Sequence, residues 1–165
     1  MSRRWLVVSA CVLLLLGGIL WLRALAQGPG GTDTAQILAQ IERGKRAAEQ
    51  RNAGALMRLV SPDYKDELGI TRPGLFMRVR EQLRDAQQLE VIVPANELRI
   101  EIAPSGRDAT VTGRMELRIT GSQGDVQTSN LTPTLTWRKE HVRRFLVFPA
   151  EEWRVVKAVG IAPSE

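Results

Sequence analysis

Residues Asp108–Thr120, with the sequence DATVTGRMELRIT, alternate apolar and polar side chains over their whole length. A period of two predicts a single long strand with one buried face and one wet face. Gly113 occupies the one in-register apolar position that has no side chain. Because an antiparallel sheet can keep one face in water, the stretch favours an antiparallel sheet. The inward residues of this strand are expected to be Ala109, Val111, Met115, Leu117 and Ile119.

The segments on either side of this strand supply its sheet partners. We expect further strands at Leu89–Val93, Glu97–Ala103, Val126–Arg138 and Trp153–Val159. Pro133 cannot donate to a strand ladder, so it predicts an edge or a bulge. The stretch Lys139–Glu152 is too long for a tight turn and carries an unbroken apolar run, which indicates an insertion between two strands.

Toward the N-terminus the apolar spacing changes from two to about 3.6 residues, which predicts helices. They are expected at Thr34–Asn52, Ala55–Val60 and Arg72–Gln88. Thr32 or Asp33 is suited to the start of the first helix, and Asn52 or Gly54 to a left-handed position at its end. Three helices followed by a strand meander predict an α+β domain, with the helices packed on a curved antiparallel sheet.

The stretch Trp5–Leu22 is apolar, carries no charge and follows Arg3 and Arg4. It is long enough for a single transmembrane anchor, but Ala24-Leu25-Ala26 also offers a signal cleavage site, and both interpretations stay open. In either case Arg3 and Arg4 stay in the cytoplasm and the chain after Gln27 is placed outside it. The product is a single-pass membrane protein, or a secreted or periplasmic protein cleaved after Ala26. The domain plan is an anchor or signal over 1–26, a Gly/Pro linker over 27–32, a folded domain over 33–161 and a tail over 162–165.

Composition limits the function classes. The formal charge is +5, but without the three N-terminal arginines the rest carries 20 basic against 18 acidic residues, which argues against nucleic acid as a partner. Cys11 is the only cysteine, so the exported part forms no disulfide. The apolar run before Cys11 is too short for a lipoprotein signal. With one histidine, His141, and one cysteine, a zinc site is not expected, and no other cofactor is.

The domain resembles the nuclear transport factor 2-like superfamily, the cone-shaped fold shared with ketosteroid isomerases and polyketide cyclases. The resemblance covers roughly 33–161 and points to a divergent, exported bacterial member. It is carried by the residues RNAGAL (51–56), LVSPDY (59–64), DATV (108–111), WRK (137–139) and WRVV (153–156). It implies a pocket at the open end of the cone, with the connector around Tyr64 near its mouth.

Four residues are predicted to line this pocket: Tyr64, Asp66, Trp137 and Trp153. The isomerases use a carboxylate base and an oxyanion hole that contains a tyrosine. Tyr64 is the only tyrosine here, and Asp63 and Asp66 flank it. The same tyrosine could instead pack in a turn, and the two tryptophans could pack in the core. No acid maps onto the base of the family, so no catalytic residue is assigned.

The insertion carries the most informative surface pattern. Arg143 and Arg144 precede an apolar run that contains Phe145 and Phe148, and such a pattern can dock a partner or a membrane surface. A buried strand with a longer loop is the alternative. His141 lies among charges and is expected to be exposed on a hairpin.

The sequence favours a non-enzymatic binding or accessory domain of the bacterial cell envelope, with an apolar small molecule as one candidate ligand. One alternative is a small-molecule isomerase or cyclase that uses the cone pocket. Another is an assembly subunit that forms a homodimer through its sheet.

Overall fold

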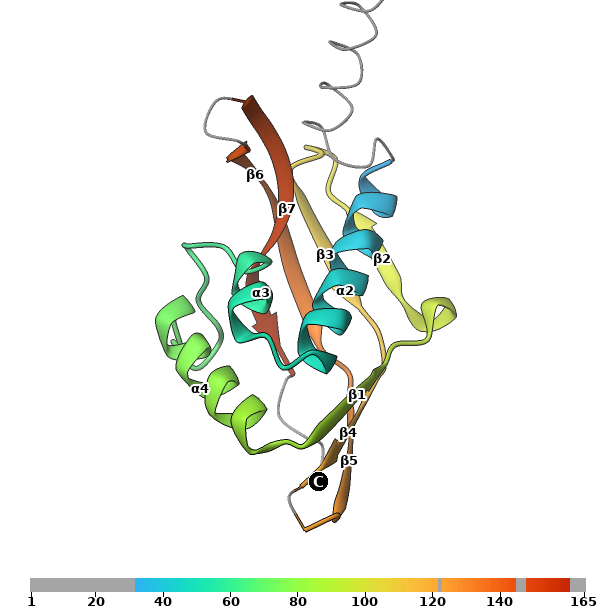
Figure 1. Cartoon of the computed structure of the whole chain (residues 1–165). Helices are drawn as coiled ribbons and strands as arrows, with labels where there is room; N and C mark the ends of the chain where they lie inside the picture. The colour runs from blue at the N-terminus through green and yellow to red at the C-terminus, as the bar shows by residue number, and fades with distance from the viewer. Residues whose placement is uncertain (1–31, 122, 145–147, 161–165) are drawn as a thin grey trace, which may run out of the picture.

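The structure, a computed structural model, describes residues 32–121, 123–144 and 148–160. Three α-helices precede a set of antiparallel strands (Figure 1). The helices are α2 (Asp33–Glu49), α3 (Ala53–Arg58) and α4 (Arg72–Asp85). They confirm the predicted α+β class. The predicted anchor or signal at 5–22 lies outside the described residues, and within the described part no helix is long and apolar enough to cross a membrane.

The strands form two antiparallel sheets. The first has the order β1-β4-β5, with β1 (Gln88–Ile92), β4 (Met115–Thr120) and β5 (Val126–Leu131). The second has the order β2-β3-β6-β7, with β2 (Arg99–Ile102), β3 (Asp108–Thr112), β6 (Thr134–Arg144) and β7 (Phe148–Val159). A short 3₁₀ helix, η1 (Ala95–Glu97), joins β1 to β2.

The prediction of one unbroken strand over Asp108–Thr120 is wrong, because β3 ends at Thr112 and β4 begins at Met115. Gly113 lies at the break. A Cβ atom at Gly113 would lie 2.6 Å from Leu98 Cδ2 and 3.1 Å from the carbonyl oxygen of Glu97. Glycine is therefore required here by the close approach of another chain segment.

The strand predicted next to this one is interrupted opposite the break at Gly113. The predicted strand Val126–Arg138 is also two strands, since β5 ends at Leu131 and β6 begins at Thr134. Met115 pairs with Leu131 and Thr112 with Thr134, so the two breaks lie side by side. Pro133 sits in this gap, where no ladder donor is needed. We call the line through the two breaks, residues 113–114 and 132–133, the crease.

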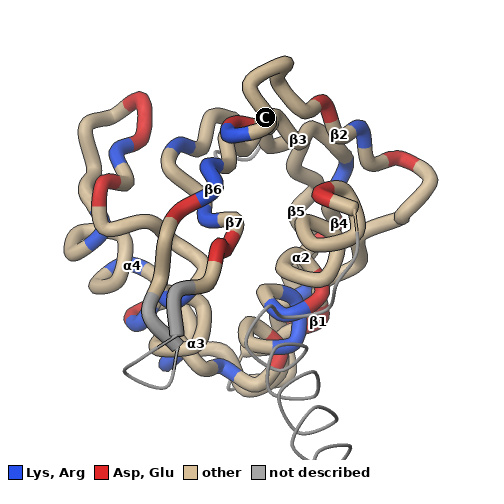
Figure 2. The backbone as a smooth tube through the Cα atoms, turned by 90° about the horizontal axis from the view of Figure 1, so that it is seen from above, with Lys and Arg blue, Asp and Glu red and all other residues tan. Residues whose placement is uncertain are grey.

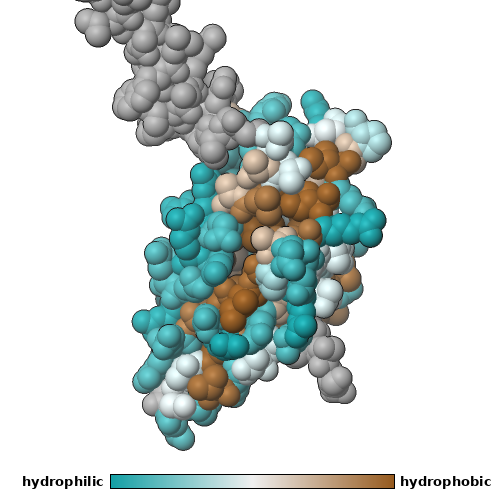
Figure 3. All heavy atoms as spheres, turned by 90° about the vertical axis from the view of Figure 1, so that its right-hand side faces the viewer, coloured by the Kyte–Doolittle hydropathy of each residue, from teal (hydrophilic) through white to brown (hydrophobic). Residues whose placement is uncertain are grey.

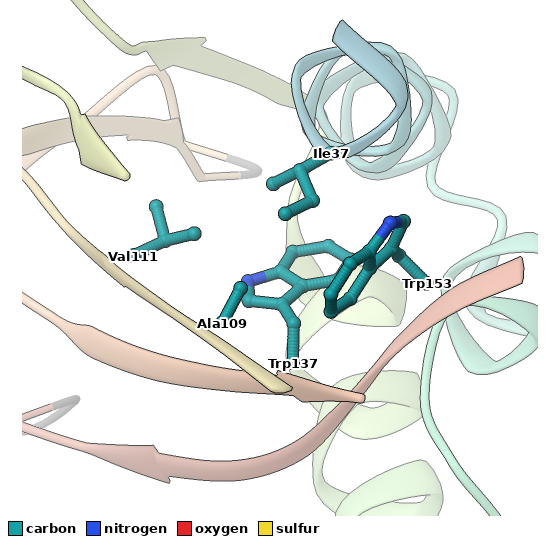
Figure 4. Packing of buried hydrophobic residues seen from close by; sticks show 5 residues of the cluster. All are labelled: Ile37, Ala109, Val111, Trp137 and Trp153. Carbon is teal, nitrogen blue, oxygen red and sulfur yellow. The ribbon is translucent and has the colours of Figure 1, made fainter. Parts of the chain in front are cut away.

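The core lies between α2 and the four-stranded sheet. Ile37 of α2 points toward the indole rings of Trp137 and Trp153, which lie beside each other, and Ala109 and Val111 complete the cluster (Figure 4). All five are at most 3% exposed, which confirms the inward placement of Ala109 and Val111. Across the crease the predicted inward residues of β4 also pack on a buried cluster, and they are Met115, Leu117 and Ile119.

The core is covered incompletely on the side that carries α2 and β2. Figure 3 shows this side, where hydrophobic surface runs between hydrophilic areas. Leu38 of α2 is 37% exposed there, and Ile41 and Ile100 are half-buried against the core. The described residues pair β2 only with β3, so one edge of β2 also remains open.

The stretch predicted as an insertion is the continuation of two strands. Strands β6 and β7 pair from Thr134↔Val159 to Arg144↔Phe148 (Figure 1). Asp33, the first residue of α2, fastens this hairpin to the helix. Its Oδ1 atom lies 2.6 Å from Lys139 Nζ and accepts a 3.3 Å hydrogen bond from Trp153 Nε1. The Lys139 ammonium also lies 5.1 Å from the centre of the Trp153 ring.

The left-handed residue after α2 is Arg51, with φ 53°, and not Asn52 or Gly54. Arg51 N donates to Ala48 O and Asn52 N to Ala47 O, which is the hydrogen-bond pattern of a Schellman helix end. Asn52 instead caps the next helix, because its Oδ1 accepts a 2.9 Å hydrogen bond from Ala55 N. At the start of α2, the Thr32 hydroxyl takes the capping role, accepting from Ala35 N.

Candidate functional site

Helices α2 and α3 and strand β7 surround a groove of about 430 Å³. The α2 residues that line it share one helix face, because they recur at three- and four-residue spacing. The ionisable and amide side chains in the lining are Gln40, Arg43, Arg46, Gln50, Arg58, Glu152 and Arg154. Sequence reasoning did not single out this site.

A glycine in α2 lets the two helices approach each other beside the groove. A Cβ atom at Gly44 would lie 3.1 Å from Leu59 Cδ1, so any larger residue would push Leu59 away. Leu59, Ala47 and Ala55 add an apolar part to the lining. The groove therefore combines a short apolar wall with charged side chains.

One of the arginines is balanced by acids. Arg154 Nη1 lies 3.8 Å from Glu140 Oε2, and Arg154 Nη2 lies 3.5 Å from Glu152 Oε2. Glu140 in turn accepts a 2.5 Å hydrogen bond from the hydroxyl of the fully buried Ser61. These contacts hold the Arg154 side chain, which is 21% exposed, in one place.

The other three arginines lack such balance. Arg46 Nε donates to the backbone oxygen of Glu42 at 3.3 Å. Within the part of the chain that the structure describes, Arg43, Arg46 and Arg58 form no ion pair. Seen from above, α2, β6 and β7 carry Lys and Arg together with Asp and Glu (Figure 2). The groove therefore carries a net positive charge.

Gln40 adds an unused acceptor to the same groove. The side chain is 93% buried, since Gln40 is 7% exposed. Its Oε1 atom is buried and has no hydrogen-bond partner among the described residues, and the same holds for Arg154 Nε. Buried polar atoms are normally paired, so these two mark a place where a partner is missing.

Tyr64 lies in a packed cluster away from this groove. It is 3% exposed and packs with Met57, Val60 and Ala158. Its hydroxyl is buried and unpaired among the described residues. Burial, with a smaller contribution from the nearby Asp66 carboxylate, raises the pKa of Tyr64 from 10.0 to about 12.

Asp66 stabilises the turn that follows Tyr64. Its Oδ1 atom accepts hydrogen bonds from Leu68 N at 2.9 Å and from Ile70 N at 2.7 Å. Two backbone donors on one carboxylate oxygen are typical of a turn-forming aspartate. The predicted pair Tyr64 and Asp66 is therefore close in space, but it does not line the groove.

Trp137 and Trp153 belong to the core cluster under α2 (Figure 4). They are 2% and 1% exposed, and neither lines the groove. The structure thus brings the two tryptophans together in one cluster and places Tyr64 in an adjoining cluster. The ligand-binding role of these four residues stays a prediction.

The predicted docking surface lies on the far end of the β6–β7 hairpin. The backbone of Arg143 and Arg144 ends β6 and that of Phe148 begins β7. Phe145 and the side chains of this set lie outside the part that the structure describes, so docking stays a prediction. His141 is exposed on the hairpin as predicted, with Nδ1 3.5 Å from Glu151 Oε1. Among the described residues, no group of three His, Cys, Asp or Glu side chains could hold a metal ion.

Solved structures show which fold this arrangement has. A nuclear transport factor 2-like superfamily protein from Salmonella enterica is 14% identical, with a TM-score of 0.61 over 82% of this chain and 95% of that chain. The chain has the nuclear transport factor 2-like fold. No family model and no curated protein matches the sequence.

Two other solved structures of similar fold are described as proteins of different kinds. A candidate dehydratase from Streptomyces avermitilis is 14% identical, with a TM-score of 0.61 over 81% of this chain and 98% of that chain. A candidate calcium/calmodulin dependent protein kinase II association domain from Xanthomonas campestris is 13% identical, with a TM-score of 0.59 over 79% of this chain and 87% of that chain. The fold alone therefore does not select between an enzyme and an assembly domain.

Proposed function

We propose that this chain is a non-enzymatic binding or accessory domain of the bacterial cell envelope, exported or anchored through residues 5–22. The observation that carries the proposal is the burial of the aromatic side chains that the resemblance places at the cone pocket. Tyr64, Trp137 and Trp153, which would face a catalytic pocket, are at most 3% exposed. An isomerase-like site needs a hydrated cavity with a free carboxylate, and the Asp66 oxygen nearest to this role already accepts two backbone hydrogen bonds.

The proposed location in the cell envelope is tested by measuring which end of the chain is accessible from outside the cytoplasm. The full chain is produced in bacterial cells with one tag before Met1 and another after Glu165. Protease added to spheroplasts is expected to remove the C-terminal tag. An anchored chain keeps its N-terminal tag protected, whereas a cleaved signal yields a mature N-terminus at Gln27 by mass spectrometry. Protection of both tags would reject export.

The non-enzymatic part is tested with a β,γ-unsaturated ketosteroid as the probe. We expect no turnover by the full chain above that of buffer. Turnover that Tyr64→Phe abolishes would replace the proposal by the enzyme alternative. The alternative of a homodimer formed through the sheet is tested by light scattering, which measures the molar mass of the full chain in detergent. A monomer at high protein concentration would reject this alternative.

A further inference from the structure

We propose that the groove between α2, α3 and β7 binds a phosphorylated sugar or polyol. Arg43, Arg46 and Arg58 would contact the phosphate, and the Gln40 amide oxygen would accept a hydrogen bond from a hydroxyl once its buried side chain turns toward the groove. This inference names the ligand class of the binding domain proposed above and rests on that proposal.

The charge of the lining selects an anion. Arg154 together with Glu140 and Glu152 carries a formal charge of −1, which is smaller than the +3 of Arg43, Arg46 and Arg58. Three unbalanced guanidinium groups from α2 and α3 remain. A phosphate monoester carries nearly two negative charges at neutral pH and offers three strong acceptor oxygens. Guanidinium groups match phosphate geometry with paired N–H donors, so such an anion fits several arginines at once.

The buried amide oxygen selects a ligand that also donates. Gln40 Oε1 can only accept, and it is unpaired although the residue is 93% buried, because Gln40 is 7% exposed. A fully ionised phosphate has no hydrogen-bond donor that could pair with Gln40 Oε1. A ligand that carries a hydroxyl beside the phosphate would supply the missing O–H donor.

Size and shape agree with a small molecule. The groove volume of about 430 Å³ lies within the range of about 300–1,000 Å³ that small-molecule sites occupy. Ala47, Ala55 and Leu59 provide an apolar wall that the C–H groups of a sugar ring can cover. A polar groove with one apolar wall suits a sugar phosphate better than a steroid or a lipid tail.

Calorimetric titration of the full chain tests the inference. The protein is kept in an uncharged polyoxyethylene detergent, which carries no sugar. The probes are glucose 6-phosphate, inorganic phosphate, glucose and glucuronate. We expect saturable one-site binding of glucose 6-phosphate, weaker binding of inorganic phosphate and none of glucose. Thermal unfolding gives a second readout, because a ligand that binds only the folded state raises its stability.

Two exposed arginines and a matched control locate the site. Arg43→Gln and Arg58→Gln are each expected to weaken glucose 6-phosphate binding about tenfold or more, since each removes a hydrogen bond to a charged group. Arg80→Gln removes the same charge from the exposed face of α4, outside the groove, and is expected to change the affinity by less than about twofold. Gln40→Leu is expected to weaken glucose 6-phosphate but leave inorganic phosphate unchanged.

Three results would overturn the inference. The first is no saturable binding of either phosphate probe up to about 10 mM, where the binding free energy is too small for a specific site. The second is wild-type affinity in both Arg43→Gln and Arg58→Gln. The third is tighter binding of glucuronate than of glucose 6-phosphate, which would make the ligand a sugar acid. None of these results depends on the tag topology, so failure of the groove site and failure of export are distinguishable.

Discussion

Tyr64 illustrates at the scale of one residue that burying an unpaired polar group lowers the free energy of unfolding. Its hydroxyl is buried without a partner among the described residues. An unpaired buried hydroxyl forfeits its hydrogen bonds to water, while the ring contributes favourable packing with Met57, Val60 and Ala158. The two effects can be separated by removing the oxygen alone.

Tyr64→Phe is expected to raise the free energy of unfolding by about 1 kcal/mol, because it removes an unpaired buried group and keeps the ring. Urea unfolding at neutral pH measures the change. A loss of stability of similar size would show instead that the hydroxyl has a partner in solution.

The raised pKa of Tyr64 also predicts a pH dependence. The folded chain holds the phenol proton up to a pKa of about 12, whereas the ordinary value is 10.0. Ionisation of Tyr64 therefore leaves the free energy of unfolding unchanged below about pH 10 and lowers it as the pH rises toward 12, because the unfolded chain loses the phenol proton first. Because Tyr64 is the only tyrosine, phenolate absorbance reports this titration directly. A titration midpoint at the ordinary value would contradict the buried placement, and Tyr64→Phe provides the blank.

Asn52 connects two helices at a single residue. Its side chain accepts the Ala55 backbone N–H at the start of α3. Asn52→Ala is expected to lower the free energy of unfolding by about 1 kcal/mol through loss of this cap. Asn52→Asp keeps the acceptor and should stay close to wild type, and Asn96→Ala controls for an exposed asparagine outside a cap. Equal effects of the two alanine variants in chemical unfolding would refute the capping role.

At the scale of elements, the crease decides how the strands divide into two sheets. Gly113 leaves no room for a side chain against Leu98 and Glu97. Gly113→Ala is expected to destabilise the domain by about 1–3 kcal/mol, because the added carbon overlaps Leu98. Gly54→Ala in α3 is the matched control, since its Cβ atom would lie at an ordinary 3.5 Å from Asn52 Oδ1.

The control variant should gain about 0.5–1 kcal/mol, as alanine does in place of glycine inside a helix. Thermal unfolding of both variants checks the contrast. A Gly113→Ala protein as stable as wild type would mean that the two chain segments do not approach as closely as described.

The crease could not be predicted from alternation. Ala109, Val111, Met115 and Leu117 are all odd-numbered, so the period of two passes through the break unchanged. Pattern reasoning therefore found which residues face inward on both sides, but not that they belong to two sheets. The close contact between Gly113 and Leu98, immediately before the neighbouring hairpin strand β2, is a tertiary feature that the alternation of side chains does not report.

The groove could not be predicted from the sequence either, because it too depends on tertiary contacts. Arg43 and Arg46 can be placed on a polar helix face from their spacing, but such faces usually meet only solvent. Arg58 and Arg154 come from α3 and β7, and only the tertiary fold brings them to the same place. The unpaired state of Gln40 Oε1 likewise has no signal in sequence.

At the scale of the whole molecule, the three buried clusters are joined into one core. Leu135 and Val155 pack on both the tryptophan cluster and the Tyr64 cluster. Leu56 and Val79 pack on both the Tyr64 cluster and the cluster across the crease. Shared residues of this kind couple the parts, so the domain should unfold as one unit.

Coincident unfolding transitions test this coupling. In a Trp5→Phe/Trp21→Phe background, fluorescence comes only from Trp137 and Trp153 of the first cluster. Their urea transition is expected to match that of far-ultraviolet circular dichroism. Leu56→Ala should lower both urea midpoints together, with a loss of about 1–2 kcal/mol in the free energy of unfolding, because Leu56 is partly buried. Separate midpoints would show that the two sheets melt independently.

The aligned breaks also limit what insertions and deletions the chain can tolerate. Adding one residue at 113–114 would slide β4 by one position and turn its inward side chains outward, while β3 would keep its pairing with β2 and β6. A compensating residue at 132–133 would restore the partnership of β4 with β5 but not that of β4 with β1. A length change along the crease therefore disturbs the three-stranded sheet even when a second change compensates for it, whereas a length change in the connection from β4 to β5 leaves the register of β4 with β1 intact.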